Sequence, residues 1–92
     1  MLLLSMNWND AAEDLLQGIL SRTPRPVREE TENSLRRIAE AAAEEEGLQR
    51  VGVNMVVAAW VKNTPEAVRE DLPRQMEQMG LDPEDFDYLL DG

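Results

Sequence analysis

The chain of 92 residues contains no cysteine and no histidine. Without cysteine it cannot form disulfides, act through a thiolate or ligate an iron–sulfur cluster, and ordinary zinc sites need at least one of these two residues. Without histidine it lacks the usual general base near neutral pH. These absences exclude several large classes of enzyme and metalloprotein. The lack of cysteine is compatible with a cytoplasmic location.

Aromatic residues are also few: two Trp, one Tyr and one Phe. Alanine, leucine, valine and methionine must therefore fill the core, which favours helix packing over a sheet sandwich. A chain of this length forms at most one domain and buries roughly 60–65% of its unfolded surface. No stretch approaches the roughly 20 apolar residues that cross a bilayer. We find no internal repeat, and we expect a small all-α protein that does not span a membrane.

Positive charge is scarce, and the formal net charge is −10 at pH 7. This argues against binding nucleic acid or anionic lipid, because both need a basic face. Residues 1–63 carry ten acids and seven bases, giving −3, whereas residues 64–92 carry nine acids and two bases, giving −7. We therefore expect a disordered lead at 1–5 (with Met6 as an alternative start), a helical domain at 6–62 and an acidic helical C-terminal extension at 63–92.

Apolar spacing predicts a first helix over about 9–20. It starts either at Asn9 or at Asp10, which with Glu13 forms a capping-box-like pair. Trp8 stands just before this start, where a large apolar residue can pack back onto the first turn.

A second helix begins between 24 and 28, where two prolines disfavour a continuous helix, and Gly47 supplies a left-handed C-cap. Glu32 and Glu40 each lie four residues from Arg36 on its polar face, which is the spacing of helical ion pairs. Its expected core face comprises Val27, Thr31, Leu35, Ile38 and Ala42.

Residues 51–61 are rich in valine, so their period alone does not separate a strand from a buried helix. Length, Ala58-Ala59 and the absence of a second strand favour a helix over about 53–62. Gly52 then stands at its N-cap, and Trp60 closes the core. The fold class we expect is therefore a bundle of three core helices plus one or two short C-terminal helices.

The extension begins with Thr64-Pro65, a good helix start. Pro73 predicts either a kink or two short helices over 65–71 and 73–79, and Gly80 ends them. Asp82-Pro83 begins a last short helix.

That last segment is both acidic and amphipathic. A calcium loop needs a central glycine and a terminal glutamate, and this segment has neither, so an acidic helix start is the better interpretation. The segment either docks in the groove of a partner or packs on its own domain. Its candidate interaction residues are Asp82, Glu84, Asp85, Phe86, Asp87, Leu89 and Leu90.

The connection between the first two helices concentrates Arg22, Arg25 and Arg28 without an acid. Arginine forks at a helix N-terminus bind carboxylates and phosphates, so a ligand or partner is one interpretation. The other is pairing with acids of the same chain, such as Glu29, Glu32 or the acidic extension.

Nucleophilic catalysis needs a base beside the nucleophile, and neither the serines nor Lys62 has an obvious one. We therefore expect no catalytic, cofactor-binding or metal-binding residues, and no enzyme.

Several of these features together resemble the PCP-reductase-like domain, a small helical domain that ends the B subunit of light-independent protochlorophyllide oxidoreductase and also occurs as short stand-alone proteins. The resemblance covers about residues 6–60. Arg25-Pro26 stands where the family has an aromatic pair, and Gly52 where it often has a capping threonine. The residues that carry it are Trp8, Ala11, Leu15, Pro24-x-x-Val27-Arg28, Ile38-Ala39, Gly47, Val51 and Ala58-Ala59.

The resemblance implies a place in chlorophyll or bacteriochlorophyll biosynthesis but no reductase activity. It implies a non-catalytic accessory or assembly protein that contacts a pigment enzyme, a photosynthetic complex (which can be membrane-bound) or a tetrapyrrole. The arginines around Arg28 are then candidates for a pigment propionate, and Trp8 or Trp60 for the macrocycle, unless the tryptophans only pack in the core. The alternative is a generic protein-interaction module acting through its acidic C-terminal helix.

Overall fold

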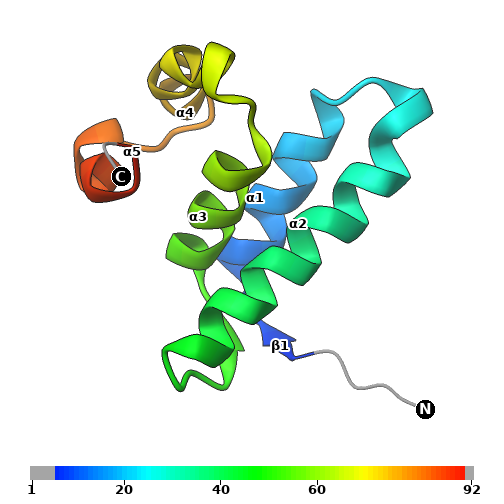
Figure 1. Cartoon of the computed structure of the whole chain (residues 1–92), viewed down its shortest axis with the longest axis vertical. Helices are drawn as coiled ribbons and strands as arrows, with labels where there is room; N and C mark the ends of the chain where they lie inside the picture. The colour runs from blue at the N-terminus through cyan, green and yellow to red at the C-terminus, as the bar shows by residue number, and fades with distance from the viewer. Residues whose placement is uncertain (1–5, 91–92) are drawn as a thin grey trace.

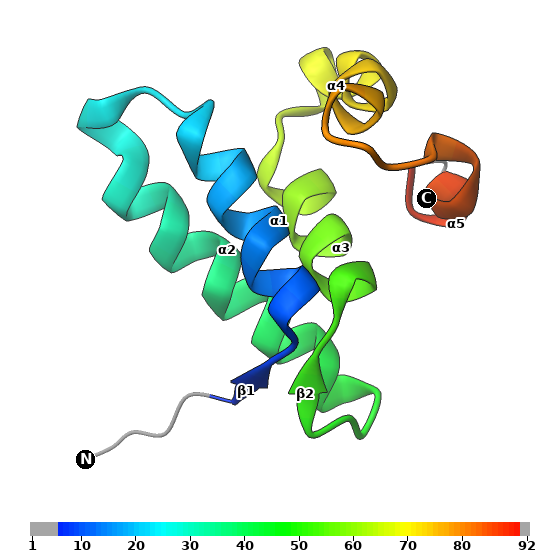
Figure 2. The same cartoon turned by 180° about the vertical axis from the view of Figure 1, so that it is seen from behind.

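The computed structural model describes residues 6–90, so the lead expected at 1–5 lies outside the described residues. The expected all-α class is confirmed: three helices form a bundle, and shorter helices follow (Figure 1). In both views α3 lies between α2 and the C-terminal helix α5 (Figure 2). The elements are β1 (Asn7–Trp8), α1 (Asp10–Ser21), α2 (Arg25–Glu45), β2 (Arg50–Val51), α3 (Val53–Asn63), the 3₁₀-helix η1 (Glu66–Asp71), α4 (Leu72–Gln78), the 3₁₀-helix η2 (Pro83–Phe86) and α5 (Asp87–Leu90).

The start of α1 differs from the expected capping box. Asn9 is the N-cap, but its side chain makes no capping hydrogen bond, and the Glu13 carboxylate binds Arg36 of α2 instead. The backbone N–H of Asn9 donates to the carbonyl oxygen of Val51 at 2.9 Å. The start of α1 is therefore held by tertiary contacts rather than by its own side chains.

Val51 does have a strand partner, contrary to expectation. β1 pairs in parallel with β2, with Trp8 opposite Val51. Two residues are too few for an alternating pattern to show in the sequence. This short pairing fixes the chain just before α1 to the chain just before α3.

Helix α2 begins at Arg25 and ends as expected, with Gly47 at a φ of 73°. The N–H of Leu48 donates back to the carbonyl oxygen of Ala43 at 2.9 Å, which completes a Schellman-type turn. The expected core face was wrong at its start, because Val27 is 45% exposed. The fully buried positions of α2 form the stripe Leu35, Ala39 and Ala43.

Helix α3 spans Val53–Asn63 with Gly52 at its N-cap, and Trp60 is buried, as expected. Its most extensive contact is with α2, and both helices contribute fully buried alanines to the core. Ala39, Ala43 and Ala59 have no exposed surface. Small residues at such a contact let two helix backbones approach closely.

The extension breaks at Pro73 as expected, into η1 and α4, and Gly80 ends α4 with a φ of 84°. Leu72, Met76 and Phe86 are buried in the same core as the bundle. Residues 63–90 therefore pack on the helical domain as an added layer. Among residues 6–90, none of the helices has the length and apolar character that crossing a membrane requires.

The close contact between α2 and α3 can be tested at Ala39. Ala39→Leu forces a larger side chain into a filled space and should lower the free energy of unfolding by about 1–3 kcal/mol. Ala41 is exposed on the same helix, and Ala41→Leu should change the free energy by less than about 0.5 kcal/mol. Urea unfolding followed by circular dichroism measures both. Equal effects of the two variants would contradict a tight contact at Ala39.

Candidate functional site

The three arginines of the connection between the first two helices have separate roles. Arg28 donates from Nε and Nη2 to the carbonyl oxygen of Thr23, at 3.2 and 2.8 Å. Arg22 donates to the side-chain oxygen of Gln78 in α4 at 2.8 Å. Arg25 is exposed at the first position of α2. Within residues 6–90 none of the three makes an ion pair with an acid.

Trp8, the fourth candidate, lies at the other end of α1. That helix is 12 residues long, which places its two ends about 18 Å apart. The indole Nε1 of Trp8 donates to Glu40 at 2.8 Å, and the Arg36 guanidinium lies 4.9 Å from the centre of the indole ring. The structure thus does not bring Trp8 together with the three arginines, and Trp8 contacts α2.

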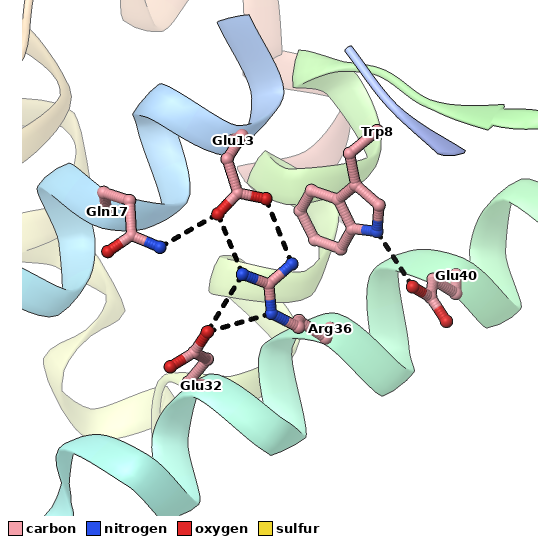
Figure 3. Close-up of polar contacts among 6 residues, drawn as sticks. All are labelled: Trp8, Glu13, Gln17, Glu32, Arg36 and Glu40. Atoms are coloured by element: carbon pink, nitrogen blue, oxygen red, sulfur yellow. Dashed lines mark hydrogen bonds and ion pairs between the residues drawn. The ribbon is translucent and has the colours of Figure 1, made fainter. Parts of the chain in front are cut away.

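Arg36 is the centre of the largest polar cluster (Figure 3). Its guanidinium grips the Glu13 carboxylate with two hydrogen bonds, of 3.1 and 2.8 Å, and also pairs with Glu32 at 2.9 Å. Gln17 donates to the same Glu13 carboxylate. The expected pair of Glu32 and Arg36 is confirmed, whereas Glu40 bonds to Trp8 instead of Arg36.

These contacts change the acidity of both partners. The hydrogen bond from Arg36, helped by that from Gln17, lowers the pKa of Glu13. The same bond from Glu13 raises the pKa of Arg36. These contacts run between side chains of α1, α2 and β1, so the cluster ties the three elements together.

The Pro-x-x-Val-Arg motif also proves to be structural. Although no repeat was expected, the sequence contains Thr-Pro-x-x-Val-Arg twice, at 23–28 and at 64–69. In both copies the threonine hydroxyl donates to the carbonyl four residues earlier, and the arginine Nε donates to the threonine carbonyl. The motif thus forms a local turn, stabilised by its own hydrogen bonds, that connects one helix to the next.

Arg22 is the candidate that does line a hollow. On one side its neighbours are polar: Asp71, Arg74, Gln75 and Gln78 enclose about 370 Å³. On the other side lies a second hollow of about 460 Å³, which also includes Arg22 and Gln78. We call this second space the amphipathic hollow. Its apolar walls come from Leu15, Val53, Met79 and Leu81. Arg22 and Asp14 are its charged lining residues.

Gly18 shapes the amphipathic hollow. A Cβ atom at this position would lie 2.7 Å from the terminal methyl of Met79, so the absence of a side chain lets Met79 lie across α1. A glycine inside a helical pattern is a signal of such close approach. Gln78, Met79 and Leu81 carried no comparable signal, because only tertiary packing brings them to α1.

The acidic segment has its apolar side occupied. Phe86 is 6% exposed, and Leu89 and Leu90 pack against the core. The Asp82 side chain accepts from the backbone N–H of Glu84 at 3.0 Å and so begins η2. Asp85 and Asp87 are exposed. Among residues 6–90 no three acids are grouped so that they could hold a metal ion.

No family model, curated protein or solved structure matches this chain in comparisons of sequence and structure. The resemblance to the PCP-reductase-like domain therefore remains an interpretation of the residues given above.

The ion pair of Glu13 with Arg36 predicts a pH-dependent stability. Because the pKa of Glu13 is lowered in the folded chain, the pair stabilises the fold above the ordinary glutamate pKa of about 4.3, and this is lost as the pH falls through the folded value. Both side chains are about one-third exposed to solvent, so Glu13→Gln should cost only about 0.5–1 kcal/mol at pH 7.

Urea unfolding at pH 7 and at pH 3 measures this difference. Glu30→Gln, at an exposed position of α2, removes the same charge and serves as the control. A cost of Glu13→Gln that is as large at pH 3 as at pH 7 would contradict the ion-pair explanation.

The repeated turn predicts a contrast between neighbouring arginines. Arg28→Ala removes two charge-assisted hydrogen bonds to the Thr23 carbonyl and should lower the free energy of unfolding by about 1–2 kcal/mol. Arg25→Ala, at an exposed position, should cost less than about 0.5 kcal/mol. Thermal and urea unfolding give both values, and a greater cost at Arg25 would refute this role of Arg28.

Proposed function

We propose that this chain is a non-catalytic accessory protein of chlorophyll or bacteriochlorophyll biosynthesis, and that its amphipathic hollow binds a tetrapyrrole that carries a carboxylate. The setting rests on the resemblance of residues 6–60. The observation that carries the ligand class is that Arg22 lines the amphipathic hollow, of about 460 Å³, together with several apolar side chains. A tetrapyrrole with a propionate has the matching combination of an apolar ring and one or more carboxylates.

Arg22 replaces Arg28 as the residue proposed to meet the carboxylate. Arg28 already donates from Nε and Nη2 to the Thr23 carbonyl, and it lines neither of the two hollows around Arg22. Arg22 donates to a neutral amide oxygen of Gln78, which a carboxylate can displace because charge-assisted bonds are stronger. Leu15, Val53 and Met79 then face the apolar part of the ligand.

A non-catalytic role is supported by the hydrogen bonds of three hydroxyl groups. Ser21, Thr23 and Thr64 each donate to a backbone carbonyl of the preceding helical turn. A nucleophile needs a base that accepts its proton, and a backbone carbonyl does not serve as one. Glu13, whose pKa is lowered, is a weaker base than an ordinary glutamate.

The test is a titration of the purified chain with protochlorophyllide and with chlorophyllide, following the pigment absorption and emission. We expect saturable binding that Arg22→Gln weakens about tenfold, since a lost hydrogen bond to a charged group is worth about 1.5–3 kcal/mol. Arg25→Gln removes the same charge three residues away and should change the Kd by less than about twofold.

Two results would contradict this proposal. Absence of saturable binding would remove the tetrapyrrole as ligand and leave assembly with a protein as the role to test. Equal weakening by Arg22→Gln and Arg25→Gln would reduce the interaction to general electrostatic attraction.

A further inference from the structure

A third hollow lies between α3, η1 and α5 and shares no residue with the two hollows around Arg22. It has a volume of about 350 Å³. Both the bundle and the extension contribute to it, so it exists only because the extension packs on α3. Its lining residues are Ala58, Val61, Lys62, Arg69, Tyr88 and Leu89.

The lining combines an apolar floor with two cations. Ala58, Val61 and Leu89 supply the apolar surface, and Tyr88, 62% exposed, adds an aromatic ring at the edge. Lys62 and Arg69 supply the charge, and no acid belongs to the lining. The hollow is thus amphipathic, and the only charged side chains in its lining are positive.

These two cations are not neutralised by the described part of the chain. Within residues 6–90 neither Lys62 nor Arg69 makes an ion pair. The Arg69 Nε donates to the Thr64 carbonyl at 3.0 Å, which fixes the guanidinium, while its two terminal nitrogens make no hydrogen bond to residues 6–90. A guanidinium held in this way presents its remaining donors in a fixed direction.

Two cations in one hollow are unusual for a chain as acidic as this one. The chain has a net charge of −10, contains a single lysine, and has only two arginines after residue 63. Acids outnumber bases by seven in residues 64–92, yet the lysine and one of those arginines line the same apolar hollow. Charge complementarity therefore selects an anion, and the apolar floor selects one with a hydrocarbon or aromatic part.

We propose that this hollow binds a small amphiphilic carboxylate, with the carboxylate between Lys62 and Arg69 and the apolar part on Ala58, Val61 and Leu89. The net charge opposes docking on an anionic bilayer, and a hollow of about 350 Å³ has the size of a small-molecule site, so we take the ligand to be a free small molecule. This site is independent of the proposed tetrapyrrole site.

Octanoate is a suitable probe, and nuclear magnetic resonance of the isotope-labelled full chain is the measurement. Saturable shifts are expected at the amides of residues 58–62, 69 and 88–89. Octyltrimethylammonium has the same apolar chain and the opposite charge, and it should produce no saturable shift there. Equal binding of the two probes would overturn the proposal, since the cations would then have no role.

Variants separate this site from the Arg22 site. Lys62 is exposed and makes no ion pair within residues 6–90, so Lys62→Gln should leave the fold intact and raise the Kd for octanoate about tenfold. Arg37→Gln removes one charge from an exposed position of α2 and should leave the Kd unchanged. Loss of binding in Arg22→Gln instead of Lys62→Gln would place the octanoate in the amphipathic hollow and overturn the assignment.

Discussion

The close contact of α2 with α3 is the constraint on which the other elements depend. A chain with four aromatic residues has few large side chains to fill a wide space between helices. The buried residues Ala39, Ala43 and Ala59 are small enough to let helix backbones lie close together. Because α2 and α3 are packed against each other, the turn at Gly47 places β2 beside α2. β2 then supplies the edge on which β1 pairs, and so sets where α1 begins.

The second constraint is electrostatic. With a net charge of −10, the folded chain brings its carboxylates closer together than the unfolded chain does, and this repulsion disfavours the compact state. Arg36 offsets part of it by holding Glu13 and Glu32 at once. Arg28 and Arg69 instead satisfy backbone carbonyls at helix junctions. Arg36 thus neutralises acids, whereas Arg28 and Arg69 close turns.

The sequence predicts the helices well because their signals are local. Helix α3 was expected at about 53–62 and is found at 53–63, and the break at Pro73 and the caps at Gly47 and Gly80 follow from backbone sterics. The pairing of Trp8 with Val51 was missed because it joins segments 43 residues apart. The exposure of Val27 was missed because helical spacing identifies an apolar stripe but does not show how much of the stripe packs against another helix.

The same distinction explains the candidate sites. Spacing identified a cluster of arginines, but only packing decides which guanidinium meets solvent, a carbonyl or a hollow. Arg22 was identified with its neighbours, while Gln78 and Met79, which complete the hollow, come from a segment 56 residues and more along the chain. No periodicity argument reaches across such a separation.

The extension changes how the proposed resemblance is to be interpreted. The resemblance was proposed for residues 6–60, yet the three hollows described above take part of their lining from residues after 63. One motif on which the resemblance rests, Pro-x-x-Val-Arg, recurs at 65–69 as a turn. A motif that recurs because it builds a turn identifies a fold better than a ligand. Both proposed binding sites lie where the extension meets the bundle. Exposed residues there, such as Arg22 and Lys62, can be replaced without disturbing the buried core, so their variants test binding separately from stability.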